Sequence, residues 1–198
     1  IEVMENRTVG PTLGQDSKDK SVKAFSIGII GVFVFMLIFY RLSGVVADIA
    51  LLLYVMLLLL VMRYLGATLT LPGIAGIILS IGMAVDANVL IFERFKEEVK
   101  RGKTLRSAMD SGFSRAIVTI LDSNITTLMA AAVLFYLGTG PIKGFAVTLA
   151  LGTLLSMFTA VTVTKFLMRF LVYSNLTKNP AFFGASAPKP ADTQEVAK

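Results

Sequence analysis

Residues 71–94 read LPGIAGIILSIGMAVDANVLIFER, an apolar run in which Asp86 is the first charged residue. An α-helix rises about 1.5 Å per residue, so about 20 residues cross a hydrocarbon core about 30 Å thick. We therefore expect residues 71–92 to span a membrane as a helix. Asp86 precedes Glu93 by about 10 Å along the helix axis, which places its carboxyl inside the hydrocarbon.

An aspartate at this depth indicates a function. A charged Asp at the centre of a spanning helix costs about 2.5 to 3.5 kcal/mol on insertion scales, because hydrocarbon solvates the carboxylate poorly. Binding a proton removes that charge, so we expect Asp86 to be a proton-relay residue, with protons as the coupling ion and no other cofactor. A plainer interpretation is a hydrogen-bonded clamp between helices that has no role in transport.

The rest of the chain contains four more segments of this kind, among 198 residues that are 55% hydrophobic. We expect them to span the membrane at residues 22–40, 45–64, 116–137 and 142–167. The predicted fold is an all-α integral membrane protein, a bundle of five transmembrane helices within a membrane domain that covers residues 22–173.

The segments outside these spans are more polar. Residues 1–21 contain helix breakers and predict the end of an extramembrane domain, and the chain begins at Ile1 without an initiating Met, as a piece of a longer protein would. Residues 93–114 place apolar side chains at helical spacing on both sides of Gly102, which predicts two short amphipathic helices at the membrane surface. Residues 174–198 mix Pro, Gly, Ser and charges, and predict a flexible tail.

Basic residues predict the orientation of the spans. Of the 19 lysines and arginines, thirteen fall on the side that holds the 93–114 connection and the C-terminus. Cytoplasmic connections are enriched in Lys and Arg, so we expect this side to be cytoplasmic and residues 1–21 to lie on the opposite side. The net charge of +6 is thereby explained by membrane orientation, and we expect no nucleic-acid partner.

The chain has no cysteine and no histidine. A disulfide, a thiol nucleophile and a cysteine-liganded metal are excluded, and we expect no metal site and no catalytic residue. Without histidine, a group that exchanges protons near neutral pH has to be a carboxyl or a lysine whose pKa is shifted.

The fourth span carries a second polar set. Asp122 follows Arg115 by seven residues, which places it at about the depth of Asp86 if the two spans are antiparallel. The two aspartates could share one polar site or clamp two helices together. The expected supporting residues are Asn88, Asp122, Asn124, Thr126 and Thr127.

Two stripes of small residues repeat every four positions. Such stripes let helix backbones approach closely and are typical of helix interfaces in membranes. The third span has Gly76, Ser80, Ala84 and Asn88, and the fifth has Gly144, Thr148, Gly152, Ser156, Ala160 and Thr164. The pattern leaves open whether the helix that each stripe faces belongs to this chain or to a partner.

Several runs together identify a family. They are ENRTVGPTLGQ from Glu5, LPGIAGI, GMAVDANVLIFERFKEE, LDSNITTL, GTGPIKGFAVTL and SMFTAVTVT, and they cover nearly the whole chain. The chain resembles the SecD branch of the SecD/SecF family of bacterial export proteins, within the resistance-nodulation-division superfamily. The SecF branch differs in the segment that corresponds to residues 86–94. Its segment ends in Phe-Asp-Arg, whereas this chain has Phe92-Glu93-Arg94.

The resemblance implies a function. It implies a subunit that uses the proton motive force, together with SecF, to promote preprotein translocation across the bacterial plasma membrane. The five spans would be the second to sixth of six, residues 1–21 would be periplasmic, and Asp86 would pair with charged residues of SecF. The implied partners are SecF, the SecYEG channel, YajC, the translocating preprotein and membrane lipid.

Three alternatives remain. The chain could be a structural scaffold of the translocation channel without proton coupling, or a small-molecule exporter of the same superfamily. It could also be an intramembrane aspartyl protease, since two aspartates at one depth can activate a water. The local sequence disfavours the protease, because Val85 and Leu121 precede the aspartates where such enzymes have Tyr and Gly.

Overall fold

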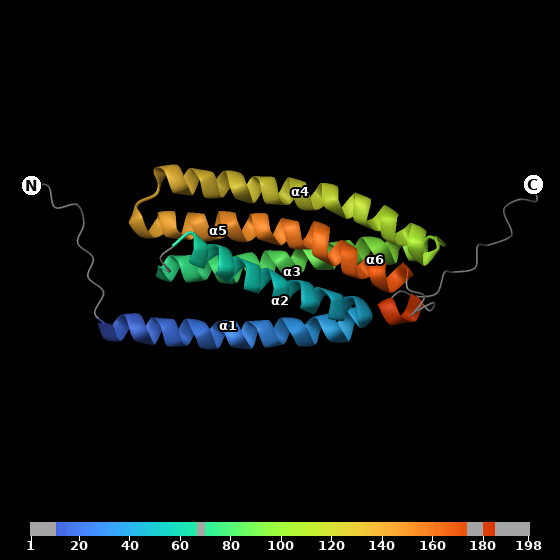
Figure 1. Ribbon diagram of the computed structural model, residues 1–198, viewed down its shortest axis with the longest axis horizontal. Coiled ribbons are helices and arrows are strands. Elements are labelled where there is room, and N and C mark those ends of the chain that lie inside the picture. Colours follow the sequence, from blue (N-terminus) through green and yellow to red (C-terminus); the bar gives the residue numbers. More distant parts are fainter. Residues whose placement is uncertain (1–10, 67–69, 174–179, 185–198) are drawn as a thin grey trace, which may run out of the picture.

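The computed structural model describes residues 11–66, 70–173 and 180–184, and all regular structure in these ranges is helical. Figure 1 shows an elongated bundle whose long helices run along one axis, with α1 and α4 on opposite sides. The elements are α1 (Pro11–Tyr40), α2 (Leu42–Tyr64), α3 (Leu71–Lys100), α4 (Leu105–Leu137), α5 (Gly140–Phe158), a π-helical turn η1 (Thr159–Thr164), α6 (Lys165–Tyr173) and a short 3-10 helix η2 (Pro180–Phe183).

Five of the helices in the described ranges are long and apolar enough to cross a membrane. The fifth consists of α5, η1 and α6, which together form one continuous span over Gly140–Tyr173. The predicted five-helix bundle is therefore confirmed. The helices extend further than predicted at the N-terminus, where α1 already begins at Pro11; residues 1–10 lie outside the described part of the chain.

The connection between the third and fourth spans differs from the prediction. In place of two short surface helices over residues 93–114, α3 continues to Lys100 and α4 begins at Leu105. The break falls at Gly102, whose φ of 87° is the left-handed conformation that glycine adopts most readily. The apolar spacing that predicted surface helices instead packs α3 on α4: a Cβ added to Gly112 would lie 2.9 Å from the Phe95 backbone, and Phe95 and Met109 are both fully buried.

A buried carboxylate holds this hairpin together at its tip. The Glu98 side chain is 1% exposed, and the cations of Arg101, Lys103 and Arg115 lie 2.6, 2.6 and 2.8 Å from its oxygens. A buried charge is tolerated when it is paired. Glu98 thereby joins the end of α3 to the loop and to the first part of α4.

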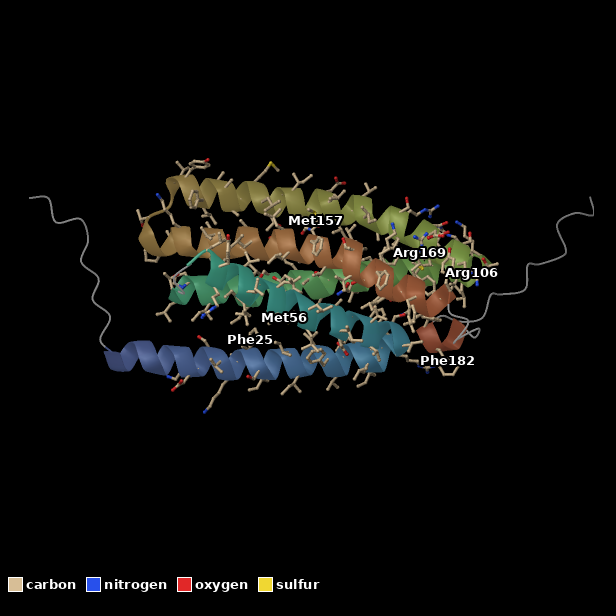
Figure 2. The ribbon with its side chains drawn as sticks, viewed as in Figure 1. Phe25, Met56, Arg106, Met157, Arg169 and Phe182 are labelled. Carbon is tan, nitrogen blue, oxygen red and sulfur yellow. The ribbon has the colours of Figure 1, made fainter. Side chains whose placement is uncertain are left out.

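The structure also differs from the predicted flexible tail over residues 174–198. Within the part of it that is described, Phe183 of η2 is fully buried, and its ring lies 5.6 Å from that of Phe95. The neighbouring Phe182 remains 55% exposed and lies at the outer edge of the bundle in Figure 2. Residues 174–179 and 185–198 of the predicted tail lie outside the described residues.

The centre of the bundle is the contact between α3 and α5. A Cβ added to Gly152 would collide with Ser80, and one added to Gly76 would collide with the Thr148 hydroxyl. The Tyr54 hydroxyl of α2 donates a 2.8 Å hydrogen bond to Ser80 at the same level. The two stripes of small residues thus face each other within this chain, and three helices meet where Gly152 leaves room.

We predict that Gly152→Ala weakens the bundle while Gly82→Ala does not. The added methyl at Gly152 meets Ser80 and the Tyr54 hydroxyl, whereas nothing lies within 4 Å of the position at Gly82. Overpacking of this kind costs about 1 to 3 kcal/mol. Thermal unfolding of the full-length subunit in detergent measures the difference; equal midpoints for the two variants would contradict the packing described here.

We further predict that Phe183→Ala releases η2 and Phe182→Ala leaves it docked. Truncating a buried Phe costs about 3 to 5 kcal/mol, and the C-terminal segment has few other buried side chains in its described part. Limited proteolysis of the purified full-length subunit should cut after Tyr173 faster in the first variant only. Equal cleavage rates in both variants would show that the Phe183 ring does not anchor the segment.

Candidate functional site

Asp86 lies on the exposed side of α3, in a groove of about 250 Å³ between α3 and α4. None of the ion pairs between described residues involves Asp86, and its carboxyl has no hydrogen-bond partner among them. The groove is lined by Met83, Asp86, Ala87 and Leu90 of α3 and by Ile120, Ser123, Asn124 and Thr127 of α4.

The helical repeat explains why these residues share the groove. On each helix the lining positions lie three, four and seven residues after the first one, which keeps them on one face. The α3 side is apolar except for Asp86, and the α4 side supplies most of the polar atoms. The Ser123 and Thr127 hydroxyls donate to carbonyl oxygens of their own helix at 3.1 Å, so their lone pairs can still accept a hydrogen bond from a visitor to the groove.

The predicted supporting residues separate into two groups. Asn124 and Thr127 line the groove beside Asp86, together with Ser123, which belongs to the same polar stretch of α4. Asp122 and Thr126 do not line it; both are exposed, and the Thr126 hydroxyl donates to the Asp122 carbonyl at 3.1 Å. The count of residues along α4 therefore predicted the depth of Asp122, but it could not predict the direction in which its side chain points.

Asn88 lies behind Asp86, on the buried side of α3. Its side chain is 4% exposed, and its Oδ1 accepts a 2.8 Å hydrogen bond from the Thr164 hydroxyl of η1. Ala84 and Ser156 of the two stripes are also buried, and a Cβ added to Gly144 would meet Thr70 at 2.6 Å. Asn88 thus belongs to the interface with the fifth span and not to the groove.

A second polar cluster ties α4 to α6 far from the groove. Asp110 lies 3.4 Å from Arg169 and accepts a 3.3 Å hydrogen bond from the Tyr173 hydroxyl. The Arg106 guanidinium lies 4.8 Å from the centre of the Tyr173 ring. Figure 2 shows Arg106 and Arg169 at the same end of the bundle. In the described ranges, no three acidic side chains gather as a metal ion requires.

Comparison with known proteins identifies the family of this chain. Residues 1–173 match the family described as "Protein export membrane protein SecD/SecF, C-terminal". Similar proteins include the protein translocase subunit SecD of Acidaminococcus fermentans, 78% identical over 96% of this chain and 46% of its own length. That of Synechocystis sp. is 55% identical over 92% of this chain and 39% of its own length. The chain thus spans less than half the length of these relatives.

A solved structure has the same fold. The crystal structure of SecDF from Thermus thermophilus, described as a translocon-associated membrane protein, superposes with a TM-score of 0.84 at 44% sequence identity. The match covers 87% of this chain and 24% of that one. A second structure, of SecDF in a super-membrane-facing form, has a TM-score of 0.79 over 83% of this chain. The chain belongs to the SecD/SecF family of protein export membrane proteins and corresponds to the C-terminal membrane region of its SecD branch.

Proposed function

We propose that this chain is the membrane region of a subunit that, together with SecF, uses the proton motive force to promote preprotein translocation across the bacterial plasma membrane. The relatives named protein translocase subunit SecD support the transport role. The likeness to a translocon-associated membrane protein supports an assembly with the SecYEG channel. YajC, the translocating preprotein and membrane lipid complete the proposed partners.

The observation that carries the proton coupling is the open position of Asp86. An ionised carboxylate in hydrocarbon costs about 2.5 to 3.5 kcal/mol, and no basic residue lines the groove of Asp86 or forms one of the ion pairs of the described residues with it. Its charge therefore has to be balanced by a proton or by a cation on a neighbouring subunit. An exchange between these two states is the elementary step of a proton relay.

The groove supplies what such an exchange needs. Ser123, Asn124 and Thr127 offer hydrogen-bonding atoms beside Asp86, so water can reach the carboxyl along a polar wall. When Asp86 takes up a proton, its attraction to a cationic partner falls and the facing helices can rearrange. One charge that crosses 100 mV supplies about 2.3 kcal/mol, so a few protons suffice to bias a domain motion of modest cost. Asp122 and Thr126, on another face of α4, would make a separate polar contact with a partner.

The proposed orientation places the Glu98 tip of the α3–α4 hairpin and the C-terminus in the cytoplasm. Three cations, Arg101, Lys103 and Arg115, surround one carboxylate there, which leaves a positive excess of the kind that cytoplasmic connections carry. Residues 1–21 would then lie on the periplasmic side.

Two other functions fit less well. An aspartyl protease needs two carboxyls around one water, and Asp122 is not among the residues that line the groove of Asp86. A scaffold without proton coupling gives no reason for a carboxyl that lines an open groove between α3 and α4. The scaffold is the alternative that the following experiment addresses.

We predict that Asp86→Asn abolishes the stimulation of preprotein export by an imposed proton gradient, because the amide cannot exchange the proton. The measurement is export into sealed vesicles that carry the complete complex, with and without the gradient. Asp48→Asn is the matched control, since it removes an intramembrane carboxyl of α2 that does not line the groove. Export in the absence of the gradient should be unaffected in both variants.

The opposite outcome is informative. If Asp86→Asn assembles normally and responds to the gradient as fully as wild type, Asp86 is not a proton carrier. The chain would then be a scaffold of the channel.

A further inference from the structure

The fifth span is not a regular α-helix. Its middle, Thr159–Thr164, is a π-helical turn, a rare form that inserts one extra residue into an α-helix and is frequent at functional sites. The chain enters this turn from α5 and leaves it as α6 without a break, so the insertion changes which side chains of α6 face the bundle.

The burial of side chains in α6 shows this change. At 3.6 residues per turn, a regular helix continued from the buried Ala160 would turn residues near 167 and 171 toward the bundle. The structure fully buries Met168 and Val172, each one position later, while Leu167 and Leu171 are only partly buried against the core. The extra residue in η1 accounts for this shift of one position. Thr164 lies on the same face of the span as Met168, and its side chain is fully buried.

Thr164 then makes a contact that no other threonine of η1 makes. Thr159 donates to carbonyl oxygens of its own span at 3.0 Å, and Thr162 is exposed. The Thr164 hydroxyl crosses to α3 and donates to the Asn88 Oδ1 at 2.8 Å. In apolar surroundings an unpaired amide oxygen is costly, so this bond resists any rotation of α3 that would part the two side chains.

Asn88 is two residues beyond Asp86, and successive residues of an α-helix are about 100° apart. The two side chains therefore point to nearly opposite sides of α3, Asp86 into the groove and Asn88 toward η1. A rotation of α3 that follows a change at Asp86 has to break the Asn88 bond or carry η1 with it. The same span ends in α6, whose Arg169 contacts Asp110 of α4.

We infer that Thr164 is a positioning residue for Asp86, held in place by the π-helical turn, and that its hydrogen bond to Asn88 couples α3 to the second half of the fifth span. The inference rests on the proposed function, because the coupling matters only if Asp86 changes state during transport. Thr164 acts through Asn88 and does not touch the groove.

The test compares three variants of the complete complex in the vesicle export assay. Thr164→Val keeps the shape and removes the hydroxyl, Thr164→Ser keeps the hydroxyl, and Thr162→Val is the matched control on the exposed side of the same turn. We expect Thr164→Val to reduce the gradient-stimulated part of export by about threefold to tenfold, the range for one hydrogen bond of ordinary net strength. Thr164→Ser and Thr162→Val should stay close to wild type.

Each other outcome overturns the inference. A Thr164→Val complex that responds like Thr162→Val shows that the hydroxyl has no role in the response. Equal losses in Thr164→Val and Thr164→Ser show that packing matters and the hydrogen bond does not. If Asp86→Asn abolishes the response while Thr164→Val leaves it intact, this inference fails and the proposed function stands; if Asp86→Asn has no effect, the proposed function fails first.

A second measurement leaves Thr164 unchanged and so remains valid if its valine variant does not assemble. Asp86→Asn mimics the protonated carboxyl, and we expect it to alter amide hydrogen exchange in residues 159–173 of the full-length protein severalfold relative to wild type. The periplasm-proximal half of the same span, residues 140–152, is the internal control. Unchanged exchange in residues 159–173 would show that α3 and α6 are not coupled.

Discussion

The close approach of α3 and α5 is the constraint on which the rest of the bundle depends. Lipid tails are as apolar as leucine, so helices in a bilayer gain little by burying apolar side chains and are held by close backbone packing and hydrogen bonds. Gly76 and Gly152 permit that packing, and Tyr54 joins it through Ser80. Because the small residues of α3 turn toward α5, Asp86 is turned to the other side, where α4 leaves a polar groove.

The two faces of α3 therefore have different structural roles. Along the face toward the fifth span the side chains are small and hydrogen-bonded, as suits a permanent contact. On the face toward α4, the two helices pack tightly at Phe95 and Gly112. Further along the same face, a groove opens at Asp86. One side of α3 is permanently packed in a rigid core, and the other side faces an open polar groove. The same helix can therefore belong to the core and present a carboxyl to a neighbour.

The sequence predicted the parts of this structure that follow from composition and period. Five apolar runs of about 20 residues predicted five spans, and the four-residue repeat of small side chains predicted the helix interface. It could not predict the ends of α3 and α4, because apolar spacing around Gly102 is the same for surface helices and for an extended hairpin. It also could not place Asp122, since depth carries no information on rotation, or the π-helical turn, since local propensity does not distinguish Thr159–Thr164 from an α-helix.

The open position of Asp86 also has a consequence for how much of this protein a cell keeps. In the proposed assembly a neighbour would cover this surface, so a copy made in excess would carry a bare carboxyl against lipid tails. The difference in free energy would make surplus copies less stable in the bilayer and open to recognition by membrane proteases. The half-life of the chain would then follow the supply of whatever covers the groove, and its abundance would be matched to the rest of the assembly without any separate control of its synthesis.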